Sequence, residues 1–339
     1  MNQNRIILFA KQPGKTSFSS LFTIKHALGT QKVGHTGTLD SFASGLLVVC
    51  AGSLTRLAGR ITEFDKAYEA VIAFGTETDT LECTGTAVRT APLPSLDALN
   101  RAVAHFSGTI MQVPPAFSAI HVNGKRASDL VRSGQAAALP ARPVTIYESQ
   151  IMETLLDDSG AVRAARVRFV VSKGTYIRSL ARDIGAECGS AAHLAGLLRT
   201  RVGSFRLEDA AGADLLAPFT IESAFKTASL LTAADKAGSA GVLPDRNWDE
   251  ERFLQRAVLE KALPMTKDFA RECGFGVLEI RDEKLPFFKN GAKLHSDWFD
   301  VSPFSVQEPF AAVFTSDGEL AGLLEKGESG YFSYSFVIH

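Results

Sequence analysis

KVGHTGTLDSFASGLL, residues 32–47, is the stretch of this chain that says most about its fold and its function. It places Asp40 in a loop rich in glycine and threonine, directly before the apolar run LLVVCAG. Asp40 is also the only acidic residue among the first 62, which contain seven lysines and arginines. A carboxylate among cations stays ionised, which suits a nucleophile or a charge stabiliser. Taken alone, however, the stretch favours a strand-to-strand turn that Asp40 caps.

Length and composition bound the class of protein. A chain of 339 residues predicts two domains, and no stretch approaches the roughly 20 apolar residues of a membrane helix. The N-terminus lacks the core of a signal peptide, so we expect a cytoplasmic protein without a membrane contact. The four cysteines lie far apart without a CxxC pair, which argues against a structural zinc and a disulfide scaffold.

The net charge of −1 conceals an uneven distribution along the chain. Residues 1–215 contain 23 lysines and arginines against 18 acids, a balance of +5, whereas the remainder contains 13 against 19, a balance of −6. A polyanion such as a nucleic acid would therefore prefer the first part of the chain.

Hydrophobic patterning predicts a mixture of helices and strands without strict βαβ alternation. The expected helices begin at Thr16 or Ser17, at Ser53, at Ser95 and at Thr175, and in the first we expect Phe18, Leu21, Phe22 and Leu28 to share one apolar stripe. The expected strands span residues 5–10, 46–50, 67–75, 116–122, 143–153 and 162–172. This pattern favours an α+β fold with a mixed or antiparallel sheet. Residues 212–247 read as a connector, and the short strand-like runs beyond it predict a small β-rich domain.

A phosphate-binding P-loop is the first alternative to consider. PGKTS, residues 13–17, resembles the end of such a loop, but the required glycine four residues earlier is replaced by Phe9. We therefore expect no nucleotide cofactor and no P-loop phosphotransferase.

A second group of candidate residues lies in SKGTYIRSLARDIG, residues 172–185. Alone, it reads as an amphipathic helix with solvated arginines, yet an arginine beside Asp40 would form a bidentate pair and hold the carboxylate in one rotamer. Tyr68, in the strand KAYEA, is by itself a half-buried packing residue. His35 is the one histidine within the glycine-rich loop, where it could stack on a base.

Four segments in the same order resemble the TruB family of tRNA pseudouridine synthases. They cover about residues 5–210 and are KVGHTGTLDSFASGLL, DKAYEAVIAFGTETDTLECTG (65–85), VPPAFSAIHVNGKRASDLVRSG (113–134) and SKGTYIRSLARDIG followed by AAHLAGLLRTRVGSF (191–205). The C-terminal part resembles, more loosely, the PUA-type RNA-binding domain of the same family. The resemblance implies a catalytic domain over residues 1–245, with a central mixed or antiparallel sheet flanked by helices, and a PUA-like domain over residues 248–339.

The resemblance also implies a role for each matching residue. Asp40 corresponds to the catalytic nucleophile, Arg178 to its paired arginine, and Tyr68 to the tyrosine that stacks on the target base and is implicated in a proton transfer. The remaining matches are substrate-binding positions: Lys11, His35 (which takes part in base flipping), Gly37, Thr38, Tyr176 and Leu197 (which lines the uracil pocket). The chain departs from the usual family pattern at Ala10, Gln12, Ser41 and Ser128.

The implied reaction converts the uridine at position 55, in the T arm of tRNA, to pseudouridine. It has no net redox change and needs no metal or other cofactor, and the carboxylate can add at C1′ or at C6 of the base. The expected partner is the T stem-loop of tRNA, and we expect a monomer. Two alternatives keep the scaffold: a tRNA-binding or tRNA-folding chaperone, and a synthase that depends on a guide RNA, which the absence of an extended basic tail disfavours.

Overall fold

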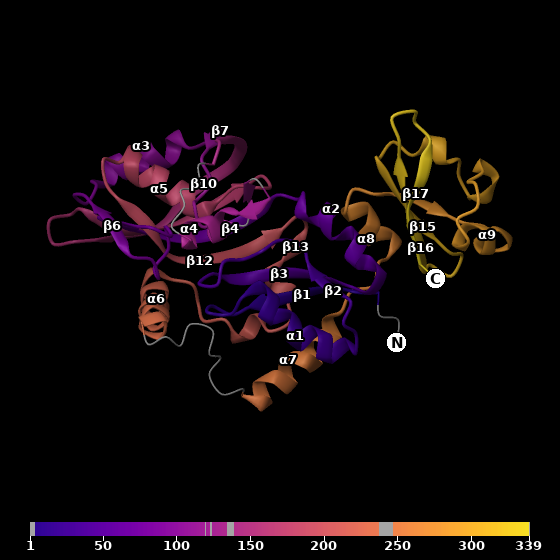
Figure 1. Cartoon of the computed structure of the whole chain (residues 1–339), viewed down its shortest axis with the longest axis horizontal. Helices are drawn as coiled ribbons and strands as arrows, with labels where there is room; N and C mark the ends of the chain where they lie inside the picture. The colour runs from indigo at the N-terminus through magenta and orange to yellow at the C-terminus, as the bar shows by residue number, and fades with distance from the viewer. Residues whose placement is uncertain (1–3, 119, 123, 134–138, 237–246, 339) are drawn as a thin grey trace.

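The computed structural model describes residues 4–338 except 119, 123, 134–138 and 237–246. The N-terminal part of the chain is built around a nine-stranded sheet, and the C-terminal part carries a smaller sheet of its own (Figure 1). In the larger sheet the main path runs β1 (Ile6–Lys11), β3 (Ser44–Ala51), β12 (Ala192–Val202), β4 (Lys66–Phe74), β11 (Val162–Val171), β10 (Arg142–Leu156) and β7 (Gly108–Gln112). β2 (Val33–His35) pairs with β3, and β13 (Phe205–Arg206) pairs with β12.

The sheet is mixed, because β3 and β12 run parallel while the other pairs of this path are antiparallel. Gly45 of β3 lies opposite Arg199 of β12, and a Cβ atom there would lie 2.3 Å from the Arg199 carbonyl oxygen. Only glycine therefore permits the two strands to approach so closely at this point. The expected α+β fold with a central mixed sheet is confirmed.

Helices cover the sheet on both faces. α3 (Leu96–His105) and α5 (Ile177–Glu187) share a buried cluster with β4 and β11. α1 (Ser17–Leu28) and α7 (Trp248–Lys261) share another with β1 and β3, and α6 (Ile221–Lys236) packs on β12. All residues of β1 and β3 are consequently buried.

Several local expectations are confirmed and others are wrong. Thr16 and Ser95 cap their helices by accepting hydrogen bonds from Ser19 and Ala98. The segment that begins at Ser53 is a 3₁₀ turn, η1 (Gly52–Leu57), followed by the short helix α2 (Ala58–Thr62).

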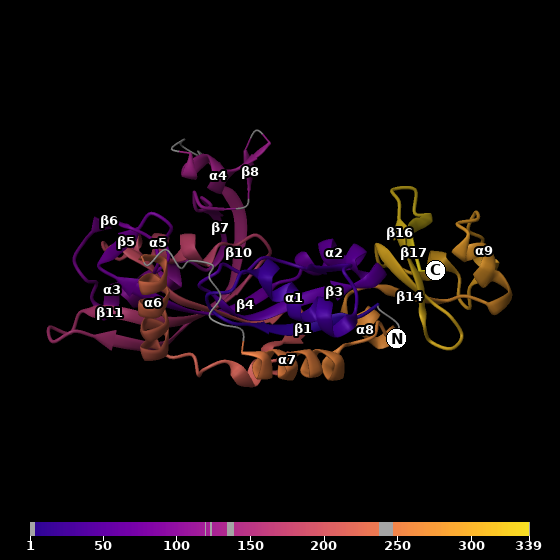
Figure 2. The ribbon, with the colours of Figure 1, turned by 60° about the horizontal axis from the view of Figure 1, so that its bottom comes forward.

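Of the strand expected over residues 116–122, the described residues form only β8 (His121–Val122), which pairs with β9 (Lys125–Arg126). This short hairpin has no partner in the main sheet, and isolated extended segments gain little stability without one. Together with α4 (Ala127–Arg132), it projects away from the body of the molecule (Figure 2).

The C-terminal sheet contains β14 (Gly276–Glu279), β15 (Phe310–Phe314), β16 (Leu320–Lys326) and β17 (Phe332–Val337), flanked by α8 (Lys267–Glu272) and α9 (Leu285–Lys289). Its inner side chains share one buried cluster with η1 and α2, and the Arg60 guanidinium lies 3.7 Å from the centre of the Phe310 ring. The expected division of the chain near residue 248 stays a prediction, and part of the expected connector lies outside the described residues. Among the described residues, no helix combines the length and apolarity that crossing a membrane requires.

Candidate active site

Asp40 lies in the loop between β2 and β3, next to the line where β3 and β12 meet. The loop is fastened to the start of α1, because the Ser17 hydroxyl donates to the Leu39 carbonyl oxygen (3.1 Å) and accepts from the Leu39 amide (2.9 Å). The Asp40 side chain is 33% exposed, so a ligand can reach it from solvent.

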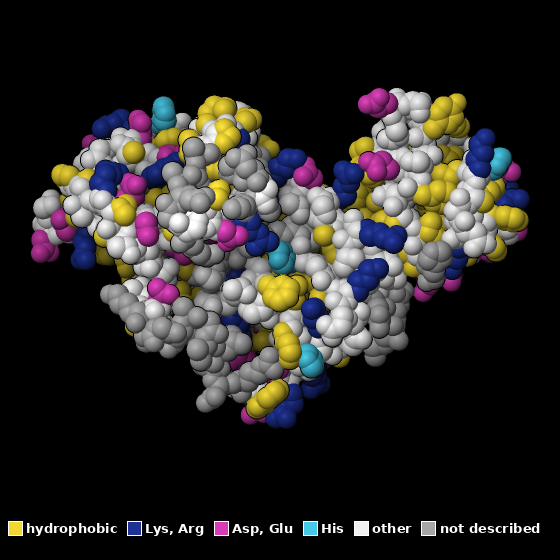
Figure 3. Space-filling view, in the orientation of Figure 1, with side chains coloured by type: hydrophobic (Ala, Val, Ile, Leu, Met, Phe, Trp, Pro, Cys, Tyr) yellow, Lys and Arg dark blue, Asp and Glu magenta, His cyan; other side chains and the backbone are white. Residues whose placement is uncertain are grey.

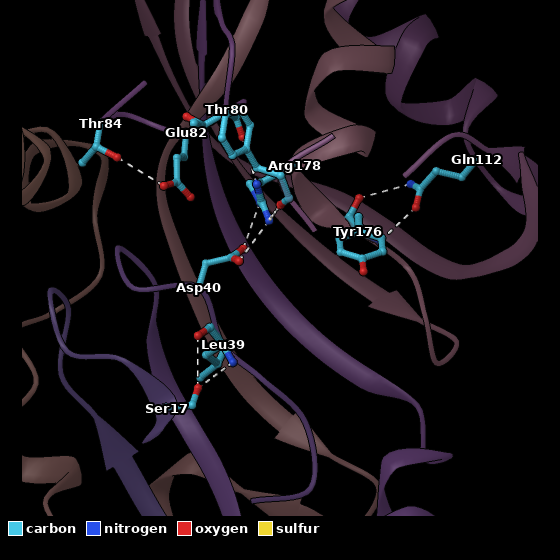
Figure 4. Close-up of polar contacts among 10 residues, drawn as sticks. Ser17, Leu39, Asp40, Thr80, Glu82, Thr84, Gln112, Tyr176 and Arg178 are labelled. Atoms are coloured by element: carbon cyan, nitrogen blue, oxygen red, sulfur yellow. Dashed lines mark hydrogen bonds and ion pairs between the residues drawn. The ribbon is translucent and has the colours of Figure 1, made fainter. Parts of the chain in front are cut away.

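Arg178, in the first turn of α5, holds this carboxylate with two parallel hydrogen bonds of 3.0 Å, from Nε to Oδ2 and from Nη2 to Oδ1 (Figure 4). Its side chain is only 6% exposed. The carbonyl oxygens of Thr80 and Phe117 accept two further bonds from the guanidinium. These two further bonds hold the guanidinium in place, and its bidentate pair with Asp40 in turn holds the carboxylate in one orientation. The contact expected between residues 40 and 178 is therefore present, while the catalytic role of each stays a prediction.

Apolar and aromatic residues next to the pair, in sequence or in the sheet, are buried together. Leu39, Phe42, Tyr68, Ile177 and Leu197 belong to one buried cluster. Tyr68 of β4 lies opposite Phe169 of β11 on one side and Arg199 of β12 on the other. Tyr68, the expected stacking residue, and Leu197, the expected wall of the pocket, thus lie in the same cluster as Leu39, the residue before Asp40.

His35 and Lys11 both lie near a buried cation. Burial lowers the pKa of His35, and the Arg199 guanidinium lowers it further. Lys11 is fully buried, and its ammonium group donates to the carbonyl oxygens of Gln12, Lys15 and Ser41. Burial lowers the pKa of Lys11 to about 7, against the opposing effect of Asp40. These bonds tie the turn after β1 to the residue that follows Asp40, and the substrate-binding role of Lys11 stays a prediction.

Tyr176 is the N-cap residue of α5 and is held by the side chain of Gln112. The Gln112 amide accepts from the Tyr176 backbone amide (2.8 Å) and donates to its carbonyl oxygen (3.1 Å), as Figure 4 shows. The Arg142 guanidinium lies 5.1 Å from the centre of the tyrosine ring. Gly37 and Thr38 lie in the same loop as Asp40, and Thr38 is exposed.

Arg199 is a residue of this site that the sequence analysis missed. It is buried, and its guanidinium donates from Nε to the Leu46 carbonyl oxygen (2.7 Å) and from Nη2 to the Gly37 carbonyl oxygen (3.3 Å). It thereby joins both sides of the Asp40 loop to the central strand β12. The one signal in the sequence was an arginine within an apolar run, LLRT.

Glu82 was also missed, although it lies within one of the four matching segments. Burial and, to a smaller extent, the nearby Asp40 carboxylate raise the pKa of Glu82 to about 7, against the lowering effect of Arg178. Thr84 donates a hydrogen bond to its carboxyl group (3.2 Å), and Figure 4 shows Glu82 beside the Asp40–Arg178 pair. A second carboxyl group therefore borders the site and is protonated in part near neutral pH.

This shift predicts a pH dependence of stability. The folded protein holds the Glu82 proton more tightly than the unfolded chain between the ordinary pKa of 4.5 and about 7. The free energy of unfolding of the wild type, minus that of Glu82→Gln, should therefore fall as the pH rises through this window and level off above it. Urea denaturation of both proteins at several pH values between 4.5 and about 7 measures this difference. A difference that does not change with pH would contradict the raised pKa of Glu82.

The described residues bring no three histidine, cysteine, aspartate or glutamate side chains together in a way that could hold a metal ion. The arrangement offers instead one oriented, partly exposed carboxylate within an apolar wall. Such a group can act as a nucleophile toward an electron-poor carbon atom.

Comparison with known proteins identifies relatives of this chain. A family model described as the TruB family pseudouridylate synthase, N-terminal domain, matches residues 25–177. A curated relative from Treponema denticola, named tRNA pseudouridine synthase B, is 43% identical over 317 residues, which are 88% of this chain and 86% of the relative. A protein of the same name from Treponema pallidum is 37% identical and is matched over 98% of this chain and 96% of its own length.

A solved structure described as an H/ACA RNP bound to a substrate RNA containing 2′-deoxyuridine has the same fold, with a TM-score of 0.61 and 21% identity over 99% of this chain and 86% of its own. The sequence relationships define the class, the pseudouridylate synthases, which are isomerases. The chain belongs to the TruB family of tRNA pseudouridine synthases.

The position of Arg199 gives a prediction for this reaction. Arg199→Lys keeps the charge, but one ammonium group cannot span the Leu46 and Gly37 carbonyl oxygens as the guanidinium does. We expect kcat at saturating tRNA to fall by up to about 100-fold with little change in KM, because the loop that carries Asp40 is displaced.

Arg201→Lys is the matched control for this test. It changes the same strand, but the Arg201 guanidinium bonds Gly203 and Asp65 rather than the loop. Arg201→Lys should keep the kcat of the wild type. An equally active Arg199→Lys enzyme would show that the guanidinium does not position Asp40.

Proposed function

We propose that this protein isomerises the T-arm uridine at position 55 of tRNA to pseudouridine, with Asp40 as the nucleophile on a flipped-out base. The observation that carries the proposal is the geometry of Asp40. Its carboxylate is oriented by a bidentate bond to a buried guanidinium, and yet one third of its side chain is open to solvent. A carboxylate held in this way is preorganised for attack on a ligand that arrives from outside.

The proposed reaction needs one such carboxylate and is an isomerisation, so the substrate and the product contain the same atoms. The N1–C1′ bond of uridine breaks, a C5–C1′ bond forms on the same base, C5 loses its proton and N1 gains one. Asp40 can start the reaction by bonding to C1′, which releases the base, or by bonding to C6 of the ring; both routes are open to a carboxylate. In either route the base has to turn within the site before it is joined again.

The walls of the site suit a base that has left its stack. A flipped base needs apolar or aromatic surfaces that replace its stacking neighbours. Leu197 supplies an apolar surface and Tyr68 an aromatic ring, both from the strands next to Asp40. We assign Tyr68 to stacking on the target base and Leu197 to the wall of the uracil pocket.

The decisive experiment incubates the purified protein with an unmodified tRNA transcript, without guide RNA or added partner proteins, and maps pseudouridine by position. Pseudouridine at position 55 is expected, and a transcript with cytidine at that position should yield none. Modification elsewhere in the tRNA would contradict the T-arm assignment. A requirement for added RNA or protein would favour the guide-dependent alternative.

We further propose that residues 1–245 and 248–339 act as a catalytic and a PUA-like domain, and that the protein works as a monomer in the cytoplasm on the T stem-loop. Two separate sheets support the presence of two domains, and the excess of positive charge in residues 1–215 supports a contact with RNA. Light scattering on the free protein and on its tRNA complex tests the monomer, which a mass of two chains would contradict.

A further inference from the structure

Phe18 departs from the pattern that its helix would suggest. The buried face of α1 includes Leu21 and Ile24, whereas Phe18, expected on the same apolar stripe as Leu21, is 74% exposed. Single exposed apolar residues are common on protein surfaces, so exposure alone decides nothing. The neighbours of Phe18 are more informative.

Four side chains form one exposed or half-buried row along α1, which we call the α1 stripe: Phe18, Phe22, Lys25 and His26. The Lys25 ammonium lies 5.6 Å from the centre of the Phe18 ring, and the rings of Phe22 and His26 lie 4.2 Å apart at an angle of 39°. Spacings of three and four residues place these groups on one side of a helix. The row extends about 10 Å from Phe18 to Lys25 at the usual helical rise.

α1 itself carries charge of one sign, although the neighbouring α7 brings the Glu251 carboxylate to the Thr23 hydroxyl, on the buried side of the helix. α1 contains no acidic residue, and Asp40 is the only acid among the first 62 residues of the chain. On the face shown in Figure 3, hydrophobic, basic and histidine side chains follow one another over the region that Figure 1 labels α1. Aromatic rings interleaved with cations are the chemistry that binds unpaired nucleotides, through stacking on bases and contact with phosphates.

The helix that carries the α1 stripe is joined to the active-site loop at its N-terminal end. Ser17, the residue before Phe18, forms both hydrogen bonds with Leu39, the residue before Asp40. These bonds fasten the N-terminal end of α1 to the loop that carries Asp40, so Phe18 lies on the end of the helix that is joined to this loop.

We infer that the α1 stripe binds the substrate RNA next to the flipped uridine, with the Phe18 ring stacked on an unpaired base and with Lys25 and His26 near the adjoining phosphates. This inference rests on the proposed function, since it takes the RNA strand at Asp40 as the occupant. It adds a binding surface outside the pocket of the target base, built from residues that take no part in the chemistry.

The test measures binding and turnover separately. In the Asp40→Asn background, which should bind without turnover, Phe18→Ala should weaken the binding of unmodified tRNA transcript by about tenfold in a filter assay. With Asp40 intact, Phe18→Ala should raise KM by a similar factor and leave kcat at saturating tRNA near that of the wild type. Lys25→Ala should lower the dependence of log Kd on log salt by about one unit.

Controls separate stacking from a general loss of structure. Phe18→Tyr keeps an aromatic face and should keep the affinity, whereas Phe18→Leu keeps apolar volume and should lose most of it. Leu230→Ala removes a side chain of α6 that is 65% exposed and should leave the Kd unchanged.

Unchanged affinity in Phe18→Ala would overturn the inference. If, in addition, the wild type were a dimer and Phe18→Ala a monomer, the α1 stripe would instead form a contact between two copies of the chain. If the wild type made no pseudouridine but bound tRNA more tightly than Phe18→Ala, the proposed function would be refuted and the RNA-binding role of the α1 stripe would be retained.

Discussion

Asp40→Asn is expected to abolish pseudouridine formation while the protein still folds and binds tRNA. Asparagine has the shape of aspartate, but its neutral amide cannot form the covalent bond to C1′ or C6 that the reaction requires. Loss of a nucleophile in other enzymes lowers turnover by about 10⁴-fold or more, and we expect a loss of that size here. Single-turnover assays with excess enzyme measure the chemical step directly.

Asp65→Asn is the matched control for this variant. Asp65 also pairs with an arginine, Arg201, and its side chain is similarly exposed, at 38%. It should retain activity because its pair lies outside the Asp40 loop. Turnover by Asp40→Asn at a rate close to that of the wild type would refute the nucleophile assignment, and loss of tRNA binding would show that Asp40 has a binding role instead.

Arg178→Ala is expected to have the second largest effect, on both activity and stability. It leaves Asp40 without its partner and removes the donors to the Thr80 and Phe117 carbonyl oxygens. We expect kcat/KM to fall by at least about 100-fold because the carboxylate loses its orientation. The loss of stability should stay below the roughly 3–5 kcal/mol of a fully buried pair, because one third of the Asp40 side chain is exposed.

Two comparisons define the role of the guanidinium. Arg178→Lys restores a charge without the two parallel bonds, so an activity between those of Arg178→Ala and the wild type is expected. Arg201→Ala breaks a more exposed pair and should cost less stability without a loss of activity. Urea denaturation and steady-state kinetics measure these effects, and normal kinetics in Arg178→Ala would show that the pair does not orient Asp40.

The sequence predicted the fold class and the contact at the centre of the site, but by different routes. Caps and periodicity are local, so Thr16 and Ser95 mark the helix starts without knowledge of the fold. Asp40 and Arg178 are 138 residues apart, and no physical property of either segment indicates the other. Only the resemblance to a family joined them.

The features that the sequence did not predict arise from contacts between segments that lie far apart in the chain. Arg199 drew no prediction, because the carbonyl oxygens that bind it belong to residues 37 and 46, far away in the sequence. Glu82 acquires its raised pKa from burial and from Asp40, neither of which a local pattern shows. Phe18 was placed on an apolar stripe by spacing alone, and spacing cannot say that α7 covers a neighbouring face of α1 and leaves Phe18 exposed.

The buried cations beneath the Asp40 loop have a consequence for the energy of the reaction. Lys11 and Arg199 donate hydrogen bonds to the carbonyl oxygens of residues 12, 15, 37, 41 and 46, so these peptide dipoles are held in place on both sides of the loop. Around a mobile loop in water, the solvent dipoles would have to reorient when a carboxylate loses its negative charge on forming a covalent bond. Here the surrounding dipoles are fixed when the chain folds, so the reorganisation energy of the attack that we propose for Asp40 is expected to be small.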